Sequence, residues 1–189
     1  GQEAYDNAVM AVKISENKGI LLPTMVTLDG FILSHTLERV EILEDDQVKK
    51  FIGEYHAEKS LLDVDKPVTY GALDLQDYYF EHKRQQFEAM GNVLPIIERV
   101  SKEYGKLSGR EYGLIEKYRT DDAERVIILM GSSVGTAKDT VDDLRNEGEK
   151  VGLIKIRVYR PFPYNALRDA LKNVKAVAVL DRAVSFGTF

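Results

Sequence analysis

A short loop rich in glycine and hydroxyl groups, residues 131–136, has the composition of an anion-binding turn. It stands between an apolar run and an amphipathic helical pattern, so its residues would lie at the first turn of a helix. Free backbone N–H groups and the positive end of the helix dipole attract negative charge there. Two arginines follow neighbouring predicted strands and would bring positive charge to the same edge of a sheet. The candidate anion site therefore consists of Gly131, Ser132, Ser133, Gly135, Thr136, Arg160 and Arg182.

This loop does not match two established phosphate-binding motifs. A phosphate loop ends in Lys followed by Ser or Thr, whereas Lys138 comes three residues after Gly135 without that pair. The glycine spacing is not that of a dinucleotide-binding fingerprint either. A structural interpretation therefore stays open, in which the glycines form a tight strand-to-helix turn and the arginines pair with surface carboxylates.

No catalytic residue is predicted among the remaining polar side chains. His35 follows a predicted strand and could shuttle a proton or hydrogen-bond a cofactor, with a structural hydrogen bond as the alternative. His56 and His82 lie far apart in charged surroundings and lack the spacing of metal ligands. Adjacent aspartates recur along the chain in capping positions or on polar faces, where acid–base chemistry is not expected. We therefore predict no catalytic and no metal-binding residue.

Composition restricts the class of protein. The 189 residues suit one domain, or one domain and part of another, and 44% hydrophobic residues allow a buried core. The net charge of −5 argues against nucleic acid as the main partner. The absence of cysteine excludes a thiolate nucleophile and cysteine-ligated zinc or iron–sulfur centres. No apolar run reaches the roughly 20 residues of a membrane span, and the first residues lack a signal-peptide pattern, so we predict a cytoplasmic protein without membrane contact.

Alternating strand and helix patterns in the last third predict the fold class. Apolar, β-branched runs indicate strands at residues 125–130, 151–159 and 176–180. One helix is predicted between the first two strands, with Thr136 as its N-cap and Gly148 closing it, and a second at residues 165–173. Short connections of this kind imply parallel pairing through right-handed crossovers. We therefore predict an α/β fold with an open, mainly parallel sheet and flanking helices.

The apolar pattern of the first forty residues predicts one helix and one strand. Small apolar residues from Ala4 to Val12 recur on one helical face, and Gly19 supplies a stop. Residues 21–28 are a candidate buried strand, although Pro23 argues against a central position in a sheet.

A charged connector and a long helical pattern occupy the middle of the chain. Residues 41–65 are predicted to be a connector with one short helix near residues 47–55. Beyond it, an apolar stripe at helical spacing runs from Phe80 to Tyr104. We interpret the stripe as packed on the core, with a groove for a partner as the alternative. Pro95 predicts a kink or a break within it.

Four stretches, in order and over nearly the whole chain, carry a resemblance to a known family: QEAYD with LLPTMVTLDGFILSHT, DKPVTYGALDLQDYYFEHKRQQFEAM, YRTDDAERVIILMGSSVGTAKDTVDDLRNEGEKVGLIKIRVYRPFP, and AVLDRAVSFG. Together they resemble the α subunit of 2-oxoacid:ferredoxin oxidoreductases. The YGALD and DGFILSHT segments look most like the pyruvate enzyme, pyruvate:ferredoxin oxidoreductase or pyruvate synthase, with the 2-oxoisovalerate type as an alternative.

The resemblance implies an enzyme that oxidatively decarboxylates pyruvate with coenzyme A to acetyl-CoA and reduces ferredoxin. Thiamine diphosphate, held with Mg²⁺ between subunits, carries out the carbon chemistry, and iron–sulfur clusters in partner subunits carry the electrons. By the same comparison, residues 1–42 form the tail of a pyrimidine-binding domain and residues 43–118 a connector with a long helix. Residues 119–189 form a domain like the C-terminal domain of transketolase.

The resemblance also implies a structural role for this segment. The family's activating glutamate and its substrate-binding Thr and Arg lie upstream of residue 1, and the diphosphate motif and cluster cysteines belong to partner subunits. We therefore expect no cofactor in this chain, no activity of the chain alone, and other subunits, with ferredoxin for the complex, as partners.

Two rival hypotheses remain. The first is a stand-alone α/β ligand-binding domain; a receiver module is disfavoured because Met130, Gly131 and Ser132 stand where its acidic residues belong. The second is another thiamine-dependent enzyme of the transketolase group, which should lack the GALDLQDYYFEHKRQ stretch.

Overall fold

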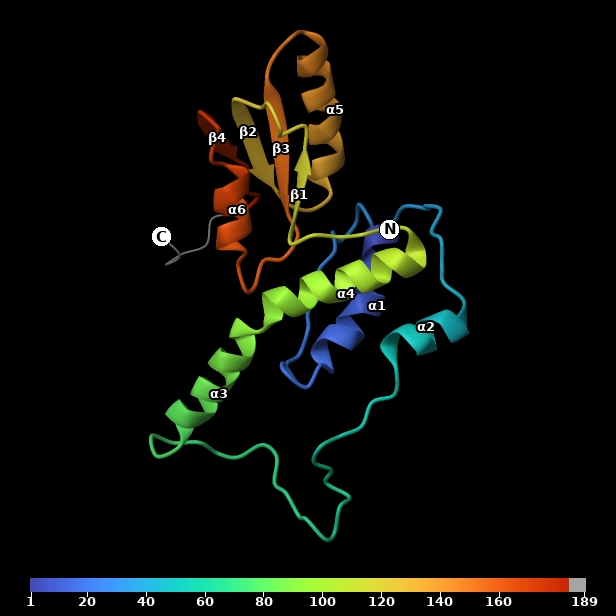
Figure 1. The fold of residues 1–189 in the computed structure, drawn as a ribbon, viewed down its shortest axis with the longest axis vertical. Coiled ribbons are helices and arrows are strands. Elements are labelled where there is room, and N and C mark those ends of the chain that lie inside the picture. The colour runs from blue at the N-terminus through green and yellow to red at the C-terminus, as the bar shows by residue number, and fades with distance from the viewer. Residues whose placement is uncertain (184–189) are drawn as a thin grey trace.

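A computed structural model describes residues 1–183, which form a helical part followed by an α/β part (Figure 1). The helical part contains α1 (Gln2–Ser15), α2 (Asp45–Ile52), α3 (Tyr79–Gly91) and α4 (Val93–Ser108). The α/β part contains β1 (Ile115–Tyr118), β2 (Arg125–Leu129), α5 (Ser133–Asn146), β3 (Val151–Ile156), α6 (Tyr164–Ala170) and β4 (Ala176–Val179). No helix of the described residues is sufficiently long and apolar to span a bilayer.

The sheet is open and mainly parallel, which confirms the predicted fold class. Its strand order is β1-β3-β2-β4, with β2 parallel to both β3 and β4. Helices α5 and α6 lie on opposite faces of the sheet (Figure 1). The short edge strand β1 pairs antiparallel to β3 and was not predicted, because its four residues, IEKY, carry too little apolar pattern to indicate a strand.

Alternation along the central strand β2 explains why the sheet packs against helices on both of its faces. Val126 and Ile128 of β2 belong to the cluster on the α6 side, whereas Leu129 packs with Val134 and Val141 of α5. Successive side chains of a strand point to opposite faces, so a strand buried on both sides is apolar throughout. The run RVIIL of β2 has this composition.

The helical part has its own core, in which α1 and α2 pack against α4. Met10, Ile14, Phe51, Val100 and Tyr104 are buried there. Helix α2 begins with Gln47 accepting a hydrogen bond from the backbone N–H of Glu44 at 3.0 Å, a contact of the capping-box type.

Three local predictions need correction. Residues 21–28 are not a strand: they run without a strand partner among residues 1–183, and Pro23 removes a backbone donor. Helix α5 begins at Ser133, with Ser132 as N-cap, so Thr136 lies inside the helix, not at its cap. The predicted helix break occurs at Asn92, between α3 and α4, and Pro95 falls in the first turn of α4, where its missing N–H has no helical partner to lose.

The predicted stripe divides at the same break. On α4, Val100 and Tyr104 are buried, as expected of a helix packed on the core. On α3, Phe80 and Phe87 are exposed, and no residue of this helix is buried. The prediction of core packing is therefore correct for α4 and for Met90 at the end of α3, and wrong for Phe80 and Phe87.

Ion pairs join the helical part to the sheet. Glu3 of α1 accepts hydrogen bonds from Lys155 and from Arg157 Nε, the latter at 2.7 Å. Burial by itself would raise the pKa of the Glu3 carboxyl, but these two cations outweigh it and lower that pKa. Arg157 also donates to Asn7 at 2.7 Å and lies over the ring of Tyr112. The first helix is thereby fixed against the central parallel strand β3.

Candidate functional site

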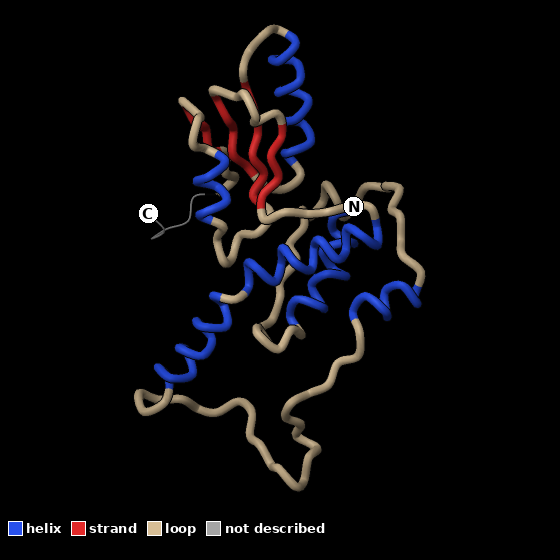
Figure 2. Tube along the Cα trace, viewed as in Figure 1, coloured by secondary structure: helices blue, strands red, loops and turns tan. Residues whose placement is uncertain are grey.

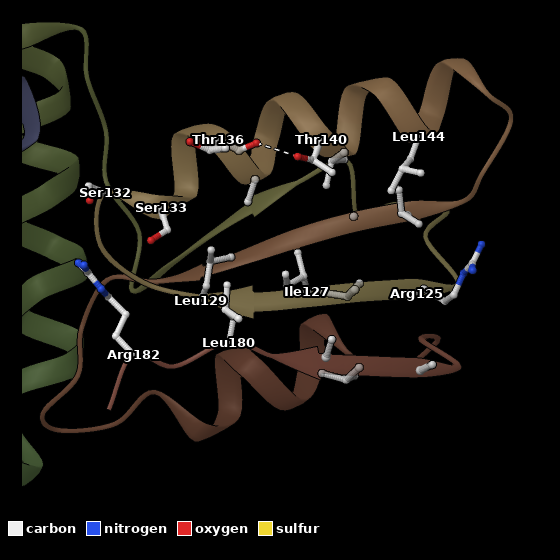
Figure 3. Close-up of a pocket in the computed structure, with 18 of the residues that line it drawn as sticks. Arg125, Ile127, Leu129, Ser132, Ser133, Thr136, Thr140, Leu144, Leu180 and Arg182 are labelled. Atoms are coloured by element: carbon white, nitrogen blue, oxygen red, sulfur yellow. Dashed lines mark hydrogen bonds between the residues drawn. The ribbon is translucent and has the colours of Figure 1, made fainter. Parts of the chain in front are cut away.

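A groove of about 840 Å³ opens on the α5 face of the sheet, above β2 and β4 (Figure 3). Ile127 and Leu129 of β2 form its floor with Ala176 and Ala178 of β4, and Leu144 belongs to the α5 wall. In the parallel register, Ile127 is paired with Ala178, so both side chains emerge on the same face. The small alanine side chains leave the space above β4 open.

One end of the groove is polar. Ser132, Ser133 and Thr136 line it from the start of α5, and Arg182 reaches it from the segment after β4 (Figure 3). Gly131 has φ +80°, a left-handed conformation in which a side chain would be strained, and this turn directs the chain from β2 into α5. The turn therefore requires glycine at this position.

A carboxylate from the helical part binds at this polar end. The Ser132 hydroxyl donates a hydrogen bond to Asp29, and Arg182 Nη1 lies 3.1 Å from Asp29 Oδ1. The Asp29 side chain is mostly buried, with 15% of its surface exposed. Ile32, three residues further on, also lines the groove. The segment around Asp29 thus reaches the carboxyl end of β2, where an anion was expected.

The predicted anion-site residues are only partly brought together. Ser132 and Arg182 meet on Asp29, while Ser133 and Thr136 line the same groove. Gly135 lies inside α5, within its first turn. Arg160 follows β3 as an exposed residue and is not among the described residues that line the groove. Arg182 lies in a loop, residues 181–185, after the last predicted strand, and Val184 and Ser185 of this loop lie outside the described residues.

Asp29 is the site residue that sequence reasoning missed. In the sequence, Asp29 and Gly30 directly follow residues 21–28, the predicted strand. Its partners lie 103 and 153 residues away in the chain, and the sequence holds 31 Asp and Glu residues that could have paired with Arg182. The one available signal was the placement of an Asp at the end of an apolar run.

The three histidines make local contacts. His35 Nδ1 lies 2.8 Å from the Ser34 hydroxyl, and its ring stacks on Phe31. His82 pairs with Asp74, and His56 lies 3.6 Å from Glu54. Among residues 1–183, no three His, Asp or Glu side chains gather in a geometry that could hold a metal ion. The groove above β2 and β4 thus suits the burial of an apolar group beside the hydroxyl groups of Ser132, Ser133 and Thr136 and the guanidinium group of Arg182.

Comparisons with protein-family models match two consecutive regions. Residues 1–102 match the model described as pyruvate flavodoxin/ferredoxin oxidoreductase, thiamine diphosphate-binding. Residues 123–189 match the model described as pyruvate:ferredoxin oxidoreductase core domain II. The first match alone covers more than half of the chain.

Comparisons with curated proteins find similar enzyme subunits. Pyruvate synthase subunit PorA of Thermotoga maritima is 53% identical, over 98% of this chain and 47% of its own length. The subunit of the same name from Methanothermobacter thermautotrophicus is 43% identical, over 98% of this chain and 48% of its own length. The alpha subunit of NADH-dependent phenylglyoxylate dehydrogenase from Aromatoleum evansii is 41% identical, over 98% of this chain and 46% of its own length. The chain spans about half the length of the curated relatives it matches.

Proposed function

The chain belongs to the pyruvate flavodoxin/ferredoxin oxidoreductase family, and on this basis we propose that it is part of the α subunit of a pyruvate:ferredoxin oxidoreductase. The enzyme would oxidatively decarboxylate pyruvate with coenzyme A, form acetyl-CoA and reduce ferredoxin. One observation carries the proposal: both family regions occur in order in one chain that aligns over 98% with a pyruvate synthase subunit at 53% identity. The 2-oxoisovalerate-type alternative is not favoured by these relatives.

Within that enzyme, we assign this segment a structural and assembly role. Two ion pairs join its helical part to its α/β part: Glu3 to Arg157, and Asp29 to Arg182. Charged groups committed to such contacts hold the helical part on the sheet and are not free for proton transfer. We propose residues 1–42 as the tail of the pyrimidine-binding domain, residues 43–118 as a connector, and residues 119–189 as the transketolase C-terminal-like domain.

In the part of the chain that the structure describes, the donor groups form no ligand set for the metals of the proposed enzyme. The region matching the thiamine diphosphate-binding model, residues 1–102, offers no cluster of His, Asp and Glu side chains for the Mg²⁺ that accompanies a diphosphate. The chain contains no cysteine to ligate an iron–sulfur cluster. We therefore propose that other parts of the complex bind thiamine diphosphate, Mg²⁺, the clusters and coenzyme A, and we assign no catalytic step to these residues.

The anion site formed by residues 131–136, Arg160 and Arg182 stays a prediction. Its backbone N–H groups lie at the start of α5, a helix of 14 residues. Asp29 already supplies a negative charge to Ser132 and Arg182. An external anion would therefore have to replace the Asp29 carboxylate on these two side chains, which weakens its binding.

Reconstitution of the enzyme tests the proposed function. The subunit that carries this sequence is combined with its partner subunits, thiamine diphosphate and Mg²⁺, and ferredoxin reduction is followed with pyruvate and coenzyme A. We expect reduction that requires both substrates. The 189-residue chain alone, assayed in parallel, should reduce no ferredoxin. An assembled complex that oxidises other 2-oxoacids but not pyruvate would refute the substrate assignment, and turnover by the chain alone would refute the assembly role.

A further inference from the structure

The segment from residue 54 to residue 91, termed the arm, projects away from both cores (Figure 1). It begins after Gly53, the C-cap of α2, and consists of a long loop followed by α3. Figure 2 shows the loop as an extended excursion below the helical part. None of the residues 54–91 is buried. Met90, at the end of the arm, packs against the helical core, and the rest of the arm is left largely uncovered by the cores of this chain.

Large apolar side chains of the arm face solvent. On α3, Phe80 is 73% exposed and Phe87 is 69% exposed, and their spacing of seven places them on one helical face. The loop adds further side chains with more than half of their surface exposed: Leu61, Leu62, Val64, Tyr70, Leu73 and Leu75. Isolated exposed leucines are ordinary on protein surfaces, but a group of this size within one segment indicates an interaction surface.

The composition of the loop argues that it is a contact element and not a linker. Connections longer than about 15 residues without secondary structure are uncommon in compact domains, and those that occur are functional loops or disordered linkers. Disordered linkers are rich in Pro, Gly and Ser and poor in aromatic residues. The loop from residue 54 to residue 78 instead contains Tyr55, Tyr70 and Tyr78 among its leucines and valines. Such a segment has apolar surface to bury against a partner.

The arm also carries most of the net charge of the chain. Eight carboxylates against four Lys and Arg residues give it a net charge of −4, out of −5 for the whole chain. In a symmetric dimer formed by this segment, each arm would face an equally acidic arm. Like charges brought together at an interface oppose binding, whereas a positive rim around an apolar surface favours it. The charge therefore favours a different polypeptide over a second copy of this chain.

We propose that the arm is the interface with another subunit of the oxidoreductase, one that offers an apolar surface bordered by Lys and Arg. The inference rests on the proposed function, in which this chain is part of one subunit of several. Phe80 and Phe87 anchor the contact, because exposed aromatic side chains on a regular helix bury large areas at low entropic cost. A hollow of about 430 Å³ between α3 and residues 20–22, lined by Tyr79 and His82, can accept a protruding partner side chain.

The test uses the complete enzyme, with substitutions in the subunit that carries this sequence. Phe80→Ala combined with Phe87→Ala removes both anchors and keeps good helix formers on α3. Tyr164→Ala is the matched control, because Tyr164 of α6 is 73% exposed, like Phe80, but lies outside the arm. Subunit association is measured by native mass spectrometry and by titration of the partner subunits. We expect the double variant to weaken association at least about tenfold, and the control to change it less than about twofold.

Salt dependence gives a second measurement. If the partner has a basic rim, association of the unmodified subunit weakens as ionic strength rises, and Glu81→Lys on α3 weakens association at low salt. Unchanged association in the double variant would overturn the proposal. So would a lowered melting temperature of the isolated double-variant subunit, because the arm would then pack within its own polypeptide. Loss of self-association with intact binding of the other subunits would overturn it as well.

Ferredoxin reduction is scored separately from assembly. A complex that assembles through the arm but does not oxidise pyruvate refutes the proposed function and still supports this interface. A fully active complex in which the double variant assembles normally refutes the interface alone.

Discussion

Substitution of the buried Asp6 by Asn should destabilise the chain more than the loss of a charge at its surface. The Asp6 carboxylate is completely buried and lies where α1, α4 and the segment before β1 meet. It accepts hydrogen bonds from the hydroxyls of Tyr104 and Tyr112, both at 2.5 Å, and from Arg110 Nε at 2.8 Å. Asparagine has the same shape, but its NH₂ group would face donors, and Arg110 would keep only Glu41, 3.2 Å away, as a counter-charge.

The expected loss of stability follows from two quantities, the lowered pKa of Asp6 and the typical cost of breaking a buried ion pair. Burial by itself would raise the pKa of the Asp6 carboxyl, but hydrogen bonds from Arg110, Tyr104, Tyr112 and Gln2 outweigh burial and lower the pKa to about 2. A decrease from 3.8 to about 2 corresponds to roughly 2 kcal/mol of stability. Removal of one partner from a buried, hydrogen-bonded ion pair typically costs about 3–5 kcal/mol. We therefore expect Asp6→Asn to lower the free energy of unfolding by about 3 kcal/mol near neutral pH.

Urea denaturation at several pH values checks both estimates, with unfolding followed by circular dichroism and tyrosine fluorescence. Because the folded-state pKa of Asp6 is lowered, its contribution is fully present above pH of about 4 and is lost as the pH falls towards 2. The difference in unfolding free energy between the unmodified chain and Asp6→Asn should therefore shrink over this range. Asp169→Asn is the control, since Asp169 pairs with Lys172 on the exposed surface, where solvent screens the pair, and its loss should change stability far less. Equal effects of the two substitutions would refute the assignment of Asp6 as the central buried charge.

Three further predictions concern the joint between the helical part and the sheet. Gly131→Ala should destabilise the chain by about 1–2 kcal/mol, because residue 131 has a φ of +80°. Gly135→Ala should stabilise the chain by up to about 1 kcal/mol, because position 135 lies within α5 and has open space for a methyl group. Thermal unfolding of both variants compares the two effects. Glu3→Gln should lower the unfolding free energy by about 1–2 kcal/mol and increase amide hydrogen exchange in α1, as it leaves Arg157 with a neutral partner; unchanged exchange would contradict this. Asp29→Asn should increase the stabilisation of the chain by inorganic phosphate, measured as a rise in melting temperature, because phosphate no longer competes with a carboxylate; an equal response of both proteins would count against the anion site.

Periodicity predicted the α/β part well because its elements are buried on defined faces. The run RVIIL of β2 is apolar on both faces, so it indicated a strand without knowledge of its neighbours. The residues 21–28 have a similar composition, yet they form no strand, because a strand also needs a partner for its backbone N–H and C=O groups. Edge strand β1 shows the converse case: a weakly patterned segment becomes a strand because β3 offers it a free edge.

The polar site was less predictable than the fold, because many carboxylates of the chain could have paired with its donor groups. The helix start at residues 131–136 could be located from local sequence, since glycine and serine act there through the backbone. The identity of the anion at that helix start depended on which of 31 carboxylates the fold would bring to it. Sequence separation gives no guide to such a pairing: Asp29 reaches Arg182 across 153 residues. Arg160 was expected on the same argument as Arg182, and the fold leaves it outside the groove.

The long-range ion pairs assign a mechanical role to the chain within the proposed enzyme. Asp29 lies in the region matched by the thiamine diphosphate-binding model, and Ser132 and Arg182 lie in the region matched by core domain II. Glu3 and Arg157 connect the same two regions at a second point. Two separate contacts resist rotation as well as separation, so the regions should move as one body. Neighbouring parts of the complex that contact the two regions would then keep a fixed distance from each other.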